Sequence, residues 1–176
     1  MSEIIHEMIT EKQITERILQ IASQINKDYK GKEVHLICIL KGSVFFCCEL
    51  AKRLEVPVTI DFMAVSSYGN STESSGRLSV TKDLNEPIDG CHCIIIEDII
   101  DTGSTLSLTK KMLFARGPAS LKICALLDKP DRRKTEIEAE YTGFIVPDKF
   151  VVGYGLDYAQ KYRNLPYIGE LEFVDE

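Results

Sequence analysis

Apolar residues recur along the first thirty positions at the spacing of an α-helix. Thr10 is followed three residues later by Gln13, the pattern of a capping box. The apolar positions that follow are spaced by three and four: Ile14, Ile18, Ile21, Ile25 and Tyr29. The pattern predicts an amphipathic helix that begins at Thr10. The apolar run Val34–Leu40 then predicts a strand covered on both faces.

The rest of the chain alternates between short apolar runs and polar breaks. Residues 41–43 end the first strand, and the sequence FFCCELAKRL predicts a helix over 45–54. Five serines and two glycines in 66–76 predict a mobile loop. The remaining expected elements are strands at 57–65, 78–81, 91–96, 121–127, 144–146 and 150–152, and a helix at 105–116 that follows a loop at 99–104.

Strands that alternate with helices predict an α/β fold with a parallel sheet. In such a sheet a ligand binds beyond the carboxyl ends of the strands. The segments expected to leave those ends are 41–43, 66–76, 98–104 and 128–134. We find no internal repeat and no low-complexity linker, and a length of 176 residues favours one domain.

The charge of the chain narrows the classes of partner. A net charge of −6 gives no broad electrostatic footprint for nucleic acid, so an anionic ligand must meet a local cluster of donors or a metal. The apolar runs are far shorter than the ~20 residues of a membrane-spanning helix. The N-terminal sequence MSEIIHEMIT lacks the basic start of a signal peptide. These features predict a soluble, cytoplasmic protein.

Six cysteines offer a second source of chemistry. Most lie in apolar stretches, and none forms a C-x-x-C pair. The triplet Cys91-His92-Cys93 suggests a metal site, but alternate side chains of a strand point to opposite faces. We therefore expect reduced, buried, structural cysteines, with the metal site as the alternative.

The segment Ile94–Leu106, IIIEDIIDTGSTL, carries the strongest functional signal. The free N–H groups and the positive end of a helix dipole favour a phosphate at the N-terminus of the following helix, where Ser104 and Thr105 add donors. Gly103 allows the backbone to come close. Glu97 and Asp98 would accept hydrogen bonds from sugar hydroxyls, so the segment predicts a ribose-phosphate cradle. The alternative is an ordinary helix cap at 101–102 with solvated strand-end acids.

This segment resembles the phosphoribosyl-pyrophosphate signature of the type I phosphoribosyltransferases. Further matches are similar to the hypoxanthine or hypoxanthine-guanine branch: LKGS at 40–43, SSYG at 66–69, LLDKP at 126–130, PDKFVVGYGLDY at 147–158 and YRNLP at 162–166. The resemblance implies the type I fold over residues 1–176 as a single domain. That fold has a central, mostly parallel twisted sheet flanked by helices, with a small hood from the terminal segments above the carboxyl ends of the strands.

The resemblance implies a purine salvage enzyme that transfers ribose 5-phosphate from phosphoribosyl pyrophosphate to N9 of hypoxanthine, with guanine as a second base. The products are IMP or GMP and pyrophosphate. Asp101, Thr102, Gly103, Ser104 and Thr105 match the 5-phosphate loop, and Glu97 and Asp98 match the acids on the ribose hydroxyls. Lys41 and Gly42 match backbone donors to pyrophosphate after a non-proline cis bond, and Arg163 matches a guanidinium there. Mg²⁺ is implied, with Glu97, Asp98 and Asp157 as its carboxylates.

The purine residues are also implied by the match. Phe150 corresponds to the stacking aromatic, Lys129 to the donor to O6, and the backbone of Val151 and Asp157 to groups that contact the base edge. Without the resemblance, Phe150 would be assigned to the core and Lys129 to a solvated loop. Asp101 matches the acid that takes the N7 proton. Arg133 matches a basic residue near the leaving group, with Arg132 as the neighbouring alternative. Ser67 and Tyr68 match the start of a lid over 66–76.

Two other functions remain as alternatives. A regulator that senses phosphoribosyl pyrophosphate would keep the 98–105 cradle without catalysis, and such proteins commonly add a basic nucleic-acid-binding face. A transferase for xanthine and guanine, orotate or uracil would keep the reaction and change the base. The sequence does not rank hypoxanthine against guanine. The family forms dimers and tetramers, so we expect a homodimer or homotetramer without nucleic-acid or membrane partners.

Overall fold

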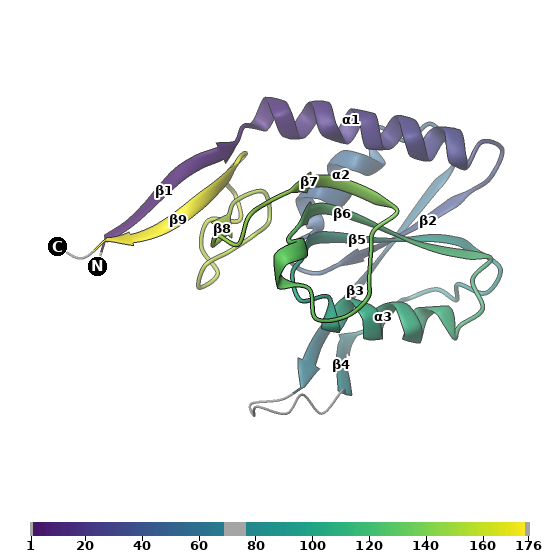
Figure 1. Cartoon of the computed structure of the whole chain (residues 1–176). Helices are drawn as coiled ribbons and strands as arrows, with labels where there is room; N and C mark the ends of the chain where they lie inside the picture. Colours follow the sequence, from purple (N-terminus) through teal and green to yellow (C-terminus); the bar gives the residue numbers. More distant parts are fainter. Residues whose placement is uncertain (1, 69–76, 175–176) are drawn as a thin grey trace.

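The computed structural model describes residues 2–68 and 77–174 and contains two β-sheets and three α-helices (Figure 1). The elements follow in the order β1 (Ser2–Ile9), α1 (Glu11–Asp28), β2 (Val34–Ile39), α2 (Val44–Ala51), β3 (Val58–Tyr68), β4 (Arg77–Lys82), β5 (His92–Ile100), α3 (Ser104–Phe114), β6 (Ser120–Asp128), β7 (Tyr141–Ile145), β8 (Val151–Val152) and β9 (Ile168–Val174). A short 3-10 helix, Pro130–Arg132, follows β6.

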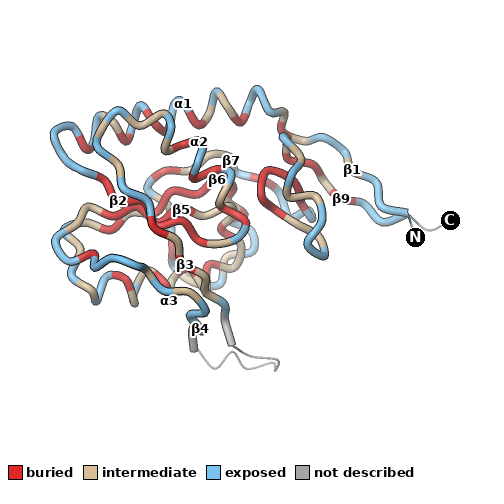
Figure 2. The backbone as a smooth tube through the Cα atoms, turned by 180° about the vertical axis from the view of Figure 1, so that it is seen from behind, coloured by how far each residue is buried: buried red, intermediate tan, exposed pale blue. Residues whose placement is uncertain are grey.

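The central sheet has the strand order β4-β3-β2-β5-β6-β7. Its neighbouring strands are parallel except for β3 and β4. Helices α1 and α2 cover one face and α3 covers the other, and the buried residues follow the inner strands (Figures 1 and 2). The chain runs from β2 to β3 on one side and later to β5 on the other side of β2. A crevice between the carboxyl ends of β2 and β5 follows from this reversal, and it is the usual ligand site of such sheets.

A second, smaller sheet joins the two ends of the chain in the order β1-β9-β8. Its strands are antiparallel, and Ser2 pairs with Val174. The hydrophobic pattern predicts neither β1 nor β9, because each strand is half exposed and its pairing partner lies at the opposite end of the sequence. Long-range pairing therefore determines these strands.

Several predicted elements are confirmed with shifted boundaries. The capping box at Thr10 is present, since its hydroxyl accepts from the Gln13 N–H and the Gln13 side chain accepts from the Thr10 N–H. β5 continues through Glu97 and Asp98 to Ile100, so the expected loop at 99–104 shrinks to 101–103. The isoleucines on both sides of Glu97 and Asp98 pair with β6, so the strand continues past the acids instead of ending at them as expected.

The loop expected at 66–76 begins later in the structure than the sequence predicts. Residues 66–68 belong to β3, where they pair with residues 77–79 of β4. The pairing is made by backbone groups, which explains why a polar sequence can extend this strand. Residues 69–76 lie outside the described part of the chain, and so does most of the expected lid.

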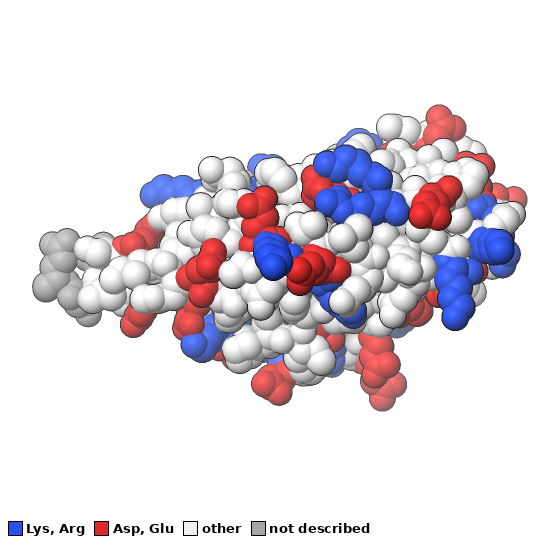
Figure 3. All heavy atoms as spheres, turned by 90° about the horizontal axis from the view of Figure 1, so that it is seen from above, with Lys and Arg blue, Asp and Glu red and all other residues white. Residues whose placement is uncertain are grey.

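The six cysteines are free thiols, as expected. Cys48 is exposed and Cys91 is half-buried, so the expectation that the cysteines are buried is wrong at these two positions. Within the described residues, no helix has the length and apolar character needed to cross a membrane. Basic and acidic side chains are interspersed on the face drawn in Figure 3.

Candidate active site

Three segments meet in the crevice between β2 and β5. A Cβ on Gly42 would lie 1.6 Å from Asp98 Oδ2, so the loop after β2 lies directly against this acid. A Cβ on Gly155 would lie 1.8 Å from the Gly42 carbonyl oxygen. At Gly155 the obstacle is backbone, so only glycine fits, whereas at Gly42 it is the end of a side chain. The loop at 41–43, the acids of β5 and the segment near 155 therefore form one site.

The loop before α3 presents backbone N–H groups. Gly103 is the N-cap residue, with a left-handed φ of 78° and no side chain to cap the helix, while the Thr102 hydroxyl accepts from the Ser104 N–H at 3.4 Å. Arg133 Nη1 donates to the Asp101 carbonyl at 2.6 Å, and the Lys134 N–H donates to the Thr102 carbonyl at 2.9 Å. These bonds hold the loop by its carbonyls and leave the first-turn N–H groups beyond Ser104 for an anion. The contact of Thr102 with Ser104 belongs to the expected alternative, a cap at 101–102, which therefore stays open beside the phosphate site.

Glu97 and Asp98 are half-buried acids within β5. Burial raises the pKa of Asp98 to about 6, with the Arg163 guanidinium opposing the shift and Asp157 adding to it. Burial, reinforced by the charge of Asp98, raises the pKa of Glu97 well above its usual range. Fully solvated acids would not be shifted in this way, so these shifts favour a site over the alternative of solvated strand-end acids. A cation or hydroxyl donors would stabilise the ionised pair.

Arg163 organises the segment around 155–163. Its Nη1 donates to the Gly155 carbonyl at 2.6 Å, and its Nη2 lies 2.7 Å from Asp157 Oδ1. The peptide bond between Leu40 and Lys41 is cis, as the resemblance implies. Lys41 Nζ donates to Gln160 Oε1 at 3.2 Å. Cationic groups from two loops thus meet at Gln160, and Arg163 also interacts electrostatically with Asp98.

The expected purine residues lie together near the end of β6. Lys129 is 7% exposed, and its Nζ donates to the Lys149 carbonyl at 2.5 Å. An ammonium group has three N–H donors, so further acceptors can be bound. Phe150 is 49% exposed and makes an edge-to-face contact with Tyr158 at a centroid distance of 5.7 Å. An exposed aromatic beside a buried lysine suits a flat base with a carbonyl group.

The two arginines after β6 have different partners. Arg133 binds the Asp101 carbonyl and forms an ion pair with Asp128. Arg132 Nε lies 2.8 Å from Asp101 Oδ1, and its Nη1 lies 3.2 Å from Asp148 Oδ1. Arg132 rather than Arg133 therefore contacts the carboxylate of Asp101. The sequence resemblance gives Arg132 only as the alternative to Arg133. Asp128 lies in the motif LLDKP, but the motif does not indicate that Asp128 pairs with Arg133.

The described residues bring no three His, Cys, Asp or Glu side chains into a ready metal-binding group. The hypothesis of a metal site at 91–93 gains no support from this, and His92 Nδ1 instead lies 2.8 Å from Ser120 Oγ. Mg²⁺ needs only one or two carboxylates when substrate oxygens and waters complete its shell. Asp98 and Asp157 interact electrostatically, so this pair fits such a partial site.

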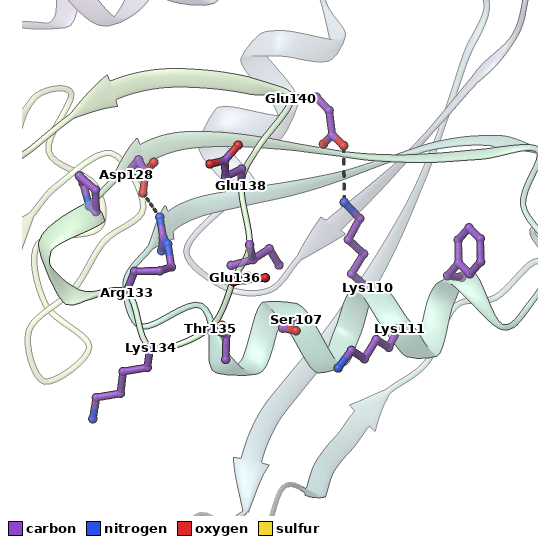
Figure 4. A pocket seen from close by; sticks show the side chains of 13 residues that line it. Ser107, Lys110, Lys111, Asp128, Arg133, Lys134, Thr135, Glu136, Glu138 and Glu140 are labelled. Carbon is purple, nitrogen blue, oxygen red and sulfur yellow. Dashed lines mark hydrogen bonds and ion pairs between the residues drawn. The ribbon is translucent and has the colours of Figure 1, made fainter.

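A pocket of about 1220 Å³ lies between α3 and the segment that follows β6 (Figure 4). It shares Asp128 and Arg133 with the site, while its other lining residues come from α3 and the segment 134–140. Figure 4 shows Lys110 reaching Glu140 across this pocket. The acids of β5 and the purine residues do not line it. The candidate site is therefore the crevice and not this pocket.

Ser67 and Tyr68, the expected start of the lid, lie at the end of β3. The carboxyl end of this strand lies on the same edge of the sheet as the crevice, because β3 runs parallel to β2. Their role in a lid remains a prediction.

Fold and site together define an α/β protein whose parallel strands carry a helix N-terminus, two acids and a loop with a lysine at one edge. The family model of the phosphoribosyl transferase domain matches residues 6–159. The hypoxanthine phosphoribosyltransferase of Salmonella typhimurium is 46% identical over the whole of both chains. The hypoxanthine-guanine phosphoribosyltransferase of Streptococcus pneumoniae is 49% identical, covering 94% of this chain and 92% of the relative.

Solved structures agree with these relatives. A hypoxanthine-guanine phosphoribosyltransferase from Bacillus anthracis has a TM-score of 0.92 at 44% identity, covering 98% of this chain and all of the other. A hypoxanthine phosphoribosyltransferase from Staphylococcus aureus has a TM-score of 0.92 at 48% identity, covering 95% and 91% of the two chains. The chain therefore belongs to the phosphoribosyl transferase family, in its hypoxanthine and hypoxanthine-guanine branch.

Proposed function

We propose that this protein transfers ribose 5-phosphate from phosphoribosyl pyrophosphate to N9 of hypoxanthine, releasing pyrophosphate and forming IMP. Guanine is the second candidate base and would give GMP. The observation that carries the proposal is the N-terminus of α3, where Gly103 provides no capping side chain, a few residues after two half-buried acids in a chain of this family. A phosphate and the hydroxyls of the sugar attached to it need donors and acceptors in this order.

In the reaction the bond between C1 of the ribose and the pyrophosphate oxygen breaks, and a bond from C1 to the purine N9 forms. The sugar passes through a cation-like state, so the chain must fix its two ends while C1 moves. We assign the 5-phosphate to the N–H groups of 102–105 and the ribose hydroxyls to Glu97 and Asp98. Holding both ends converts the transfer into a short displacement of C1.

Pyrophosphate leaves with most of the negative charge, which the chain must stabilise locally. We assign it to the backbone N–H groups of Lys41 and Gly42 and to the Arg163 guanidinium. These groups already lie on facing loops, so little reorganisation is needed as charge develops. Mg²⁺, held by Glu97, Asp98 or Asp157 together with substrate oxygens, supplies further charge neutralisation when bound.

The purine is assigned to the surface beside Phe150. Its 6-oxo group would accept a hydrogen bond from Lys129, and backbone groups of Val151 and Asp157 would contact its edge. Adenine has an amino group in place of the 6-oxo group, so its N–H donors would face the ammonium donors of Lys129. This arrangement favours 6-oxopurines over adenine.

As N9 attacks C1, the purine loses a proton from N7. Asp101 lies at the junction of the phosphate loop and the purine segment, and its carboxylate is the assigned acceptor of that proton. Arg133 holds the backbone of Asp101 in place and is assigned to the region of the leaving group. Arg132 lies against Oδ1 of this carboxylate, so we assign the proton transfer to Oδ2.

We extend the proposal to three features of the whole chain. The β1-β9-β8 sheet is assigned as the hood of a single domain over 1–176, and Ser67 and Tyr68 as the start of a lid. The chain is assigned to the reducing cytoplasm, which suits its six free thiols. The chain is assigned as a homodimer or homotetramer, as the family resemblance implies, and large exposed apolar side chains such as Phe45 and Ile60, each 43% exposed, suit such an interface. Light scattering on the purified protein measures this state directly.

A base panel tests the proposed function. The purified chain is incubated with phosphoribosyl pyrophosphate, Mg²⁺ and one of hypoxanthine, guanine, xanthine, adenine, uracil or orotate, and nucleotide formation is followed by absorbance. We expect turnover with hypoxanthine and none with adenine or the pyrimidines. Turnover confined to uracil or orotate would overturn the base assignment. Binding of phosphoribosyl pyrophosphate without any transfer would favour the sensing regulator, to which the relatives above lend no support.

A further inference from the structure

Gln160 connects the groups assigned to pyrophosphate. Its Oε1 accepts from Lys41 Nζ at 3.2 Å and from Arg163 Nη2 at 3.4 Å. Its backbone N–H donates to Asp157 Oδ2 at 2.9 Å. One residue thus contacts the loop after β2, the arginine and the candidate metal carboxylate.

We propose that Gln160 is a positioning residue for pyrophosphate. Its side chain holds Lys41 and Arg163, which lie on facing loops, in place before pyrophosphate binds. This inference rests on the proposed function, and it adds the Lys41 ammonium group to the backbone N–H groups and the Arg163 guanidinium already assigned to pyrophosphate. Gln160 itself need not touch the substrate.

The chemistry of the amide suits this role. A carbonyl oxygen has two lone pairs and can accept from both cations at once, without the charge that would repel a phosphate. Lys41 retains two further N–H donors, and Arg163 retains its bond to the Gly155 carbonyl. Pyrophosphate oxygens can therefore replace the amide at each cation, since hydrogen bonds between charged groups are stronger than those to a neutral carbonyl.

The backbone supports the same conclusion. Gln160 has a left-handed φ of 67°, and its neighbour Ala159 has a φ of 48°. Non-glycine residues in this region cost free energy and persist where the surroundings impose them. Here the left-handed turn directs the Gln160 N–H to Asp157 and its side chain to Lys41. Gly155, which packs against the Gly42 carbonyl, joins the same two loops through their backbones.

The expected effect is an entropic one. Without the amide, Lys41 is an exposed, flexible side chain that must be ordered when pyrophosphate binds. Ordering one such side chain costs about a 2- to 12-fold loss in affinity, converted from the usual range per side chain. The assignment therefore predicts weaker pyrophosphate binding and an unchanged purine site.

The test uses Gln160→Met, which keeps side-chain length and imposes a similar demand on the left-handed backbone. Isothermal titration calorimetry measures the Kd of pyrophosphate with Mg²⁺, and steady-state kinetics measure kcat and both KM values. We expect the pyrophosphate Kd and the KM of phosphoribosyl pyrophosphate to rise about 2- to 12-fold. The hypoxanthine KM and kcat should stay within twofold. The control is Lys161→Ala, an exposed neighbour whose backbone alone pairs with Tyr158.

A double variant separates positioning from a general effect on the loop. In a Lys41→Met background, Gln160→Met should raise the pyrophosphate Kd by a smaller factor than in the wild type, because one of its two cationic partners is gone. The same factor in both backgrounds, or an unchanged Kd in Gln160→Met, would overturn the inference while the wild-type activity stands. A wild-type chain that neither binds pyrophosphate nor turns over would overturn the proposed function, and this inference with it.

Discussion

Adding one methyl group at Gly42 tests the geometry of the crevice. The new Cβ of Gly42→Ala would lie 1.6 Å from Asp98 Oδ2 and 2.7 Å from its Cγ, whereas real Cβ atoms keep at least 3.0 Å. The carboxylate must therefore retreat by about 1.4 Å from its present position. Since the obstacle is the end of a side chain, the fold can accept the methyl group while the acid moves away from the ribose.

A displacement of about 1 Å at a group that positions a substrate can cost about 100-fold in rate. We therefore expect Gly42→Ala to lower kcat/KM for phosphoribosyl pyrophosphate by about that factor. Direct binding of hypoxanthine should change far less, because the purine segment lies at the end of β6. Steady-state kinetics with varied phosphoribosyl pyrophosphate measure the first quantity, and equilibrium dialysis measures the second.

Gly31→Ala provides the control at the opposite edge of the sheet. Its Cβ meets nothing within 4 Å, but its φ of +76° strains any side chain. This variant should lose about 1–3 kcal/mol of stability and keep its kcat/KM. If Gly42→Ala kept kcat/KM within a few-fold, the contact between Gly42 and Asp98 would have no part in catalysis.

Three further predictions address other residues. Asp101→Asn should keep binding of phosphoribosyl pyrophosphate within a few-fold and slow kcat by about 100-fold or more, because an amide cannot accept the N7 proton; a near-normal kcat removes Asp101 from that role. Lys129→Met should raise the hypoxanthine KM, since the 6-oxo group loses a partner at a cost of about 1–3 kcal/mol; an unchanged KM contradicts the assignment. Burial alone would raise the pKa of Asp61, but hydrogen bonds from three backbone N–H groups outweigh burial and lower that pKa. The ionised carboxylate therefore stabilises the fold at neutral pH, and this stabilisation is lost as the pH falls through the folded pKa. Asp61→Asn should therefore unfold at lower urea concentration than the wild type at pH 7, with a smaller difference in acid, and a difference that grows in acid would refute this sign.

The parts of the site that the sequence predicts are local in the chain. The phosphate loop, the acids before it and the glycine at its turn lie within one short segment, so spacing alone indicates their chemistry. The same holds for the capping box at Thr10. In each case the physical reason is a backbone geometry that neighbouring residues determine.

The parts that the sequence does not predict depend on contacts between distant segments. The contact of Arg132 with Asp101 joins two different loops, and so does that of Gln160 with Lys41. Strands β1 and β9 likewise form because each provides the other's edge. A single sequence shows which residues could donate or accept, but the folded chain decides which of them meet.

The most direct test is a crystal structure of the protein with IMP, pyrophosphate and Mg²⁺. The account predicts that the 5-phosphate accepts hydrogen bonds from the N–H groups of residues 102–105. It also predicts the purine ring against Phe150, with O6 bonded to Lys129, and pyrophosphate between Gly42 and Arg163. A phosphate bound instead in the pocket lined by Lys110 and Lys134, with the crevice free of ligand, would contradict it.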